Sequence, residues 1–119
     1  MSAQDLEFPF LGPEGFMPIC YRQWGAADNP RVVICVHGLS RNRLDFDELG
    51  AALAGNYRVL VPDMPGRGDS GWLADKTGYT HELYRQVCAG LIARSGVQSL
   101  LWVGTSMGGI IGMSLQRWS

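Results

Sequence analysis

Residues 100–109 read LLWVGTSMGG, a short apolar run followed at once by a turn rich in glycine. The turn, residues 104–108, has the form Gly-x-Ser-x-Gly with Ser106 at its centre. A serine held between a strand and a helix takes a strained backbone conformation, and small neighbours let the two elements approach closely. Such a turn raises the hydroxyl clear of the sheet and directs the next backbone N–H, that of Met107, toward it. The stretch therefore predicts a strand, an activated serine and a helix in succession.

Strands and helices alternate along the rest of the chain. Apolar runs predict strands at residues 19–24, 32–36, 58–62 and 100–103. Apolar residues at helical spacing predict helices at residues 46–54, 81–95 and 107–115. Asp45 with Glu48 is expected to cap the first helix, and Thr80 the second. This alternation is typical of βαβ units, so the predicted fold is α/β, a mostly parallel sheet with flanking helices.

The composition favours one globular domain. With 119 residues, 46% hydrophobic and 18% charged, the chain has material for a single modest core, and we do not expect disorder. Residues 1–18 are rich in proline and glycine and are expected to form a loosely ordered lead-in, with at most a weak strand near residues 8–10. Residues 19–119 are expected to form the domain proper.

Charge and cysteine usage narrow the classes of function. A net charge of −1 gives no basic surface for nucleic acid. The apolar runs are far shorter than the roughly 20 residues of a membrane span, and the N-terminus lacks the features of a signal peptide. The three cysteines are scattered, which favours buried free thiols and a reducing compartment. We therefore expect a cytoplasmic protein, and no cluster of residues at ligand spacing predicts a metal or cofactor.

A second loop could complete a site around Ser106. His37-Gly38-Leu39 follows the buried strand at residues 32–36. A hydrolytic serine needs two N–H donors for the negative oxygen of its tetrahedral intermediate, and a loop leaving a neighbouring parallel strand can supply one. We expect the Leu39 N–H to act beside the Met107 N–H. His37 is interpreted as a residue that shapes this loop, not as the base.

The loop after the strand at residues 58–62 allows two interpretations. Asp63 is expected to order the loop rather than to act as an acid. Gly66, Gly68 and Gly71 match G-x-G-x-x-G, which raises a dinucleotide-binding alternative. That motif requires the glycines to open a helix, and residues 72–78 do not have a helical pattern. NAD(P) binding that depends on the glycines would favour this alternative.

These three strand–loop elements, in this order, resemble the α/β-hydrolase family over residues 19–115. The resemblance implies that Ser106 is the nucleophile, and that Leu39 and Met107 supply the oxyanion hole. Supporting loop positions would be His37, Gly38, Gly104 and Gly108. A serine at position 106 argues against the dehalogenase and epoxide-hydrolase branches, which attack with a carboxylate. Arg67 is a departure, since many members have histidine there.

The resemblance also implies the reaction. A small-molecule acyl substrate with an ester-like bond (a carboxylic ester, thioester or lactone) would be cleaved through an acyl-enzyme. The family's chain order is serine, then an acidic residue, then histidine. Residues 107–119 contain no Asp, Glu or His, and the histidines of the chain are His37 and His81. His81 is interpreted as a solvated surface residue.

We therefore expect the N-terminal part of a truncated α/β-hydrolase fold, inactive by itself. The alternative is a non-catalytic fragment or binding module that uses an exposed sheet edge. The particular acyl substrate and the oligomeric state do not follow from the sequence.

Overall fold

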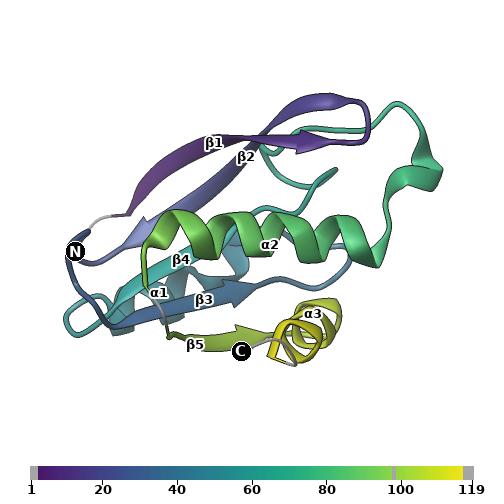
Figure 1. The fold of residues 1–119 in the computed structure, drawn as a ribbon. Coiled ribbons are helices and arrows are strands. Elements are labelled where there is room, and N and C mark those ends of the chain that lie inside the picture. The colour runs from purple at the N-terminus through teal and green to yellow at the C-terminus, as the bar shows by residue number, and fades with distance from the viewer. Residues whose placement is uncertain (1–2, 98, 117–119) are drawn as a thin grey trace.

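A computed structural model describes residues 3–97 and 99–116 as five strands and their connecting helices (Figure 1). The strands are β1 (Gln4–Gly12), β2 (Gly15–Trp24), β3 (Val32–Val36), β4 (Arg58–Pro62) and β5 (Leu101–Gly104). The α-helices are α1 (Asp47–Leu53), α2 (His81–Ser95) and α3 (Met107–Gln116). Two short 3₁₀ helices are η1 (Arg43–Phe46) and η2 (Lys76–Gly78). The strands form one mixed sheet in the order β1-β2-β4-β3-β5.

The part of the sheet that carries the predicted loops is parallel. β3 lies between β4 and β5 and pairs in parallel with both, whereas β2 pairs antiparallel with β4. Because parallel strands point the same way, the loops that follow β3, β4 and β5 leave the sheet at one edge. The α/β architecture predicted from the sequence is confirmed, and the predicted bounds of β3 and β4 are those observed.

Both faces of β3 are covered, as its unbroken apolar sequence predicts. Ile34 and Val36 belong to a core that includes residues of α2 and α3, whereas Val33 and Cys35 pack with Phe46 on the opposite face. Figure 1 shows the same layers, with α2 and α3 on one side of the sheet and α1 on the other. The two helical layers hold the carboxyl edge of the sheet in place from both sides.

The expectation of a loosely ordered lead-in is wrong, because β1 pairs along its whole length with β2. Phe8 is buried in the core with Ile19, its partner across the strands, and this burial stabilises the hairpin. Gly15 has a φ of 108°, which a non-glycine residue would adopt only with strain, and it begins the returning strand. The proline and glycine content suggested loose order, but an edge strand such as β1 tolerates a proline such as Pro9, since one side of the strand has no hydrogen-bonding partner.

Of the two predicted helix caps, the one for α2 is confirmed and the one for α1 is wrong. Thr80 caps α2 by accepting a hydrogen bond from the Leu83 N–H at 3.1 Å, and Gly96 ends it with a φ of 74°. The predicted capping pair at the first helix does not form. Asn42 caps η1 instead, and Asp45 binds Arg41 at 2.8 Å. Within the described ranges, no helix is both long enough and apolar enough to cross a bilayer.

All three cysteines are free and buried, which confirms the interpretation drawn from their scattered positions. Burial raises the pKa of the Cys35 thiol and that of the Cys88 thiol to about 12. A thiol with so high a pKa is protonated at neutral pH and is a poor nucleophile. Cys35 and Cys88 are therefore not candidates for a catalytic nucleophile.

Candidate functional site

Ser106 lies at the corner between β5 and α3 and is exposed. Its φ is 54°, and no other non-glycine residue in the described ranges has a positive φ. A left-handed conformation costs a residue with a Cβ about 1–2 kcal/mol, so the corner is a strained one. The strain is imposed by the turn and leaves the serine side chain open to solvent.

The turn around Ser106 requires glycine at positions 104 and 108, because other backbone segments pass too close for a side chain. A Cβ on Gly104 would collide with the backbone of Gly108 and Gly109, and a Cβ on Gly108 would collide with the Val36 carbonyl. The Thr105 N–H also donates to the Val36 carbonyl oxygen at 3.2 Å. Two glycines and one hydrogen bond thus fasten the Ser106 turn to the end of β3.

The loop after β3 passes directly beside Ser106. A Cβ built on Gly38 would lie 3.6 Å from the Thr105 carbonyl oxygen and 3.7 Å from the Ser106 Cβ. In the part of the chain that the structure describes, the Leu39 N–H has no protein acceptor. The Met107 N–H is at the first position of α3, where no preceding helical turn supplies a carbonyl. Two backbone N–H groups without helical or sheet partners thus lie close to the serine, one in the loop after β3 and the other at the start of α3.

His37 is wholly buried and both of its ring nitrogens are occupied. The Met64 N–H donates to Nε2 at 2.9 Å, so the neutral ring carries its proton on Nδ1, which donates to the Gly38 carbonyl oxygen at 2.7 Å. Burial lowers the pKa of His37, which favours this neutral form. The hydrogen bond from Met64 joins the loop after β4 to the loop after β3, and the one to Gly38 holds the ring within its own loop.

Asp63 is buried at the end of β4 and orders its loop, as interpreted from the sequence. Its carboxylate accepts hydrogen bonds from the Arg43 N–H at 2.7 Å and the Asp69 N–H at 2.9 Å, and it pairs with the Arg43 guanidinium. The Ser70 hydroxyl donates to the Asp63 carbonyl oxygen at 2.7 Å. A Cβ on Gly68, which has a φ of 52°, would collide with this carboxylate.

Arg43, which no sequence pattern singles out, is buried and binds three carboxylates. Its guanidinium contacts Asp5 at 3.3 Å and Asp69 at 2.8 Å besides Asp63. Burial alone lowers the pKa of Arg43, but its hydrogen bonds to Asp5 and Asp69 raise the pKa above the ordinary value on balance. The one available signal was the acidic residue that follows a buried strand, because a buried carboxylate requires a cation nearby.

Neither a dinucleotide nor a metal ion fits this loop. Gly66 and Gly68 lie in turns with φ of 79° and 52°, and they are followed by irregular backbone rather than by a helix. The dinucleotide alternative is therefore wrong, because no helix N-terminus receives the phosphates. Side-chain atoms of Cys20, Asp63 and Asp69 come within 4.8 Å of one another, but Arg43 already neutralises both carboxylates.

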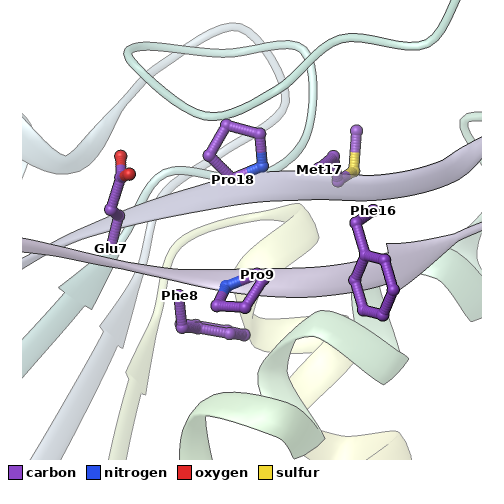
Figure 2. A pocket seen from close by; sticks show the side chains of 6 residues that line it. All are labelled: Glu7, Phe8, Pro9, Phe16, Met17 and Pro18. Atoms are coloured by element: carbon purple, nitrogen blue, oxygen red, sulfur yellow. The ribbon is translucent and has the colours of Figure 1, made fainter.

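A shallow cavity of about 310 Å³ lies elsewhere, on the β1–β2 hairpin (Figure 2). Its lining residues are Glu7, Phe8, Pro9, Phe16, Met17 and Pro18. None of them belongs to the loops that surround Ser106. The candidate catalytic residues therefore lie at the carboxyl edge of the sheet, apart from this cavity.

The family model described as the alpha/beta hydrolase fold matches residues 31–115, which include all three loops. The chain belongs to the α/β-hydrolase family. The matched segment contains the buried strands, the Gly38 loop and the Ser106 turn, so the resemblance inferred from the motifs is confirmed.

Individual α/β-hydrolase relatives share both sequence and shape with this chain. A 3-hydroxybutyrate-oligomer hydrolase of Cupriavidus necator is 50% identical over 105 residues, covering 88% of this chain and 36% of that protein. A thioesterase domain from the curacin biosynthetic pathway is 29% identical, with a TM-score of 0.89 over 99% of this chain and 42% of that one. An α/β hydrolase from Novosphingobium aromaticivorans is 34% identical, with a TM-score of 0.84, and 41% of it is covered. The chain thus spans well under half the length of these relatives.

Proposed function

We propose that this α/β-hydrolase chain carries the nucleophile and the oxyanion hole of a serine hydrolase that cleaves carboxylic esters. The observation on which the proposal rests is Ser106, exposed at a strained corner with a φ of 54° and with the Gly38 loop beside it. In the proposed reaction the Ser106 oxygen attacks the ester carbonyl carbon and the alcohol leaves. Water then attacks the resulting acyl-enzyme, releasing the acid and restoring the serine.

The oxyanion hole is proposed to consist of the Leu39 and Met107 N–H groups. The Gly38 carbonyl and the Leu39 N–H belong to one trans peptide unit, so they point in opposite directions. His37 Nδ1–H and the Arg41 N–H, at 2.7 Å and 3.1 Å, both donate to that carbonyl. They thereby fix the direction of the Leu39 N–H before substrate arrives, and such preorganisation is what stabilises a developing negative charge.

A general base and its orienting carboxylate are also needed, because a serine hydroxyl is a weak nucleophile until its proton is removed. Both ring nitrogens of His37 are hydrogen-bonded in the interior, and His81 is exposed at the start of α2. We propose that the acid and the histidine are supplied by sequence beyond residue 119. On this proposal residues 1–119 alone have negligible turnover.

For the substrate we propose an oligomeric ester of a short hydroxy acid. The support is the 50% identity to the 3-hydroxybutyrate-oligomer hydrolase across most of this chain. A thioester remains the competing substrate, in view of the thioesterase domain with a similar backbone. An oxygen ester and a thioester of the same acid form analogous tetrahedral intermediates and the same acyl-enzyme, so kinetics with each of them must decide between the two.

The test is a chimera in which residues 1–115 replace the corresponding part of the Cupriavidus necator enzyme. We expect the chimera to hydrolyse 3-hydroxybutyrate oligomers faster than a short acyl thioester, and to be labelled by a fluorophosphonate. Ser106→Ala should abolish both hydrolysis and labelling. Labelling that persists in Ser106→Ala would remove this residue as the nucleophile, and faster thioester cleavage would overturn the proposed substrate. Robust hydrolysis by residues 1–119 alone would refute the missing-base proposal.

The second candidate function is partner binding through the edge of the sheet. β5 is the last strand in the sheet order, and its Leu101 is 57% exposed. An uncovered strand edge can pair with another chain. A chimera that folds but neither reacts with the fluorophosphonate nor turns over ester would favour this candidate over hydrolysis.

A further inference from the structure

Leu39 is held by its backbone and not by its side chain. The side chain is 59% exposed, so little packing restrains it. The peptide before it is fixed by the hydrogen bonds to the Gly38 carbonyl oxygen. The peptide after it carries the Leu39 carbonyl, and its partner lies on a different loop: Arg67 Nε donates to that oxygen at 2.8 Å.

The half-buried Arg67 side chain is itself held by two further hydrogen bonds and by two tyrosine rings. Its Nη1 donates to the Pro65 carbonyl oxygen at 2.8 Å and to the Tyr84 hydroxyl at 2.7 Å. Its guanidinium carbon lies 5.3 Å from the ring centre of Tyr84 and 5.8 Å from that of Tyr79. Tyr84 is itself buried on α2. The arginine therefore connects the Leu39 loop to the loop after β4 and to the core side of α2.

We propose that Arg67 is a positioning residue for the oxyanion hole, acting through the Leu39 backbone. The inference rests on the proposed function. The peptide plane that carries the Leu39 N–H is joined to the chain at both of its ends, so motion of the next peptide can still tilt it. His37 and Arg41 restrict the preceding peptide and Arg67 the following one. Without Arg67 the following peptide loses its anchor, and the N–H spends less time directed at the substrate oxygen.

Arginine suits this role better than lysine. The planar guanidinium can donate to two carbonyls and a hydroxyl while it stacks on an aromatic ring. An ammonium at the same place could reach the Leu39 carbonyl but would lose the stacking and the fixed fork of donors. Arg67→Lys is therefore expected to preserve part of the effect, and Arg67→Gln very little of it.

The experiment uses the chimera and separates binding of the ester from stabilisation of its oxyanion. Misplacing one donor is expected to lower kcat of Arg67→Gln about tenfold, with KM changed less than about twofold. A trifluoromethyl ketone serves as the probe, because Ser106 adds to its carbonyl and leaves an oxyanion in the hole. Its inhibition constant should rise about as much as kcat/KM falls, with Arg67→Lys intermediate.

The matched control is Arg31→Gln. Arg31 also contacts a tyrosine, with Nη2 donating to the Tyr57 hydroxyl at 2.7 Å and the guanidinium 4.4 Å from the ring centre, but it lies away from the site loops. We expect unchanged kcat and unchanged inhibition. Should Arg67→Gln fail to fold, Tyr84→Phe tests the same link by removing the hydroxyl acceptor, with a fall in kcat of about two- to threefold.

Two results would overturn the inference. One is an Arg67→Gln variant that melts at a lower temperature while kcat and ketone inhibition match those of Arg31→Gln, since Arg67 would then be structural only. The other is a rise in KM with kcat unchanged, which would make Arg67 a substrate contact. If Ser106→Ala retains activity, the proposed function fails instead. If Ser106→Ala is inactive and Arg67→Gln is normal, only the inference about Arg67 fails.

Discussion

Gly38 and Ser106 meet across the carboxyl edge of the sheet, so closely that a Cβ on residue 38 would lie 3.7 Å from the Ser106 Cβ. One residue follows β3 and the other follows β5, and 68 positions separate them in the chain (106 − 38). The contact exists because β3 and β5 are parallel neighbours. A site built from two such loops depends on the space between them.

The first prediction concerns that space. Gly38→Ala adds a methyl group at ordinary contact distance and should be tolerated, whereas Gly38→Val adds branches that crowd Ser106. We expect Gly38→Val to reduce fluorophosphonate labelling of the chimera at least about tenfold, because small displacements at a reacting centre are costly. Gly55→Val is the control, since nothing lies within 4 Å of a Cβ there. Equal labelling of the two valine variants would contradict the prediction.

The strained backbone of Ser106 predicts a conflict between stability and activity. Glycine adopts a φ of 54° without the penalty that a Cβ brings, so Ser106→Gly should be more stable than Ser106→Ala by about 1 kcal/mol. Both variants lack the hydroxyl and should be inactive. Urea denaturation of the two chimeras measures the difference. An alanine variant at least as stable as the glycine variant would show that the corner carries no strain.

Asp63 and Asp69 both bind Arg43, but we expect their replacement by asparagine to lower the free energy of unfolding by unequal amounts. Removing the Asp63 charge leaves a buried guanidinium short of its partner, so Asp63→Asn should cost about 3 kcal/mol of unfolding free energy. Asp69 binds the same guanidinium, but its side chain is 73% exposed, so Asp69→Asn should cost about 0–1 kcal/mol. Chemical denaturation of both variants tests this. Similar losses would mean that burial does not govern the cluster.

His37 predicts a dependence of stability on pH. Because burial lowers its pKa in the folded state, the unfolded chain binds the proton more readily. The contribution of neutral His37 to the free energy of unfolding is therefore fully present above the unfolded pKa of about 6.5. As the pH decreases below that value, the free energy of unfolding falls by up to about 1.4 kcal/mol per pH unit. His81→Gln leaves His37 as the one histidine of residues 1–119 and should keep the slope between pH 7 and 5. A flat profile over that interval would contradict the prediction.

Local patterns predicted most of the elements. The apolar run of β3 and the Thr80 cap of α2 depend on neighbouring residues, so the sequence alone was sufficient for them. The β1–β2 hairpin was missed because its stability comes from Phe8 reaching a core that distant residues build. The capping pair at Asp45 failed because Arg41 binds that carboxylate.

The candidate site shows the same division. The Gly-x-Ser-x-Gly motif and the His37-Gly38 pair could be found from their positions after apolar strands. Arg43 and Arg67 could not, since each is defined by partners on other elements: Asp63 after β4 for the first, and the Leu39 carbonyl with Tyr84 for the second. Polar side chains that join loops leave no periodic signal in a single sequence.

Asp5 carries a consequence for anyone who produces this protein. It binds Arg22 at 2.8 Å and also reaches Arg43, so a residue near the amino terminus belongs to the ionic cluster beneath the Asp63 loop. The hydrogen bond from Arg22 lowers the pKa of Asp5, which keeps the carboxylate charged in mildly acidic buffers. Cloning boundaries and cleavable tags should therefore leave β1 intact, because trimming it would remove an ion pair that supports the Asp63 loop.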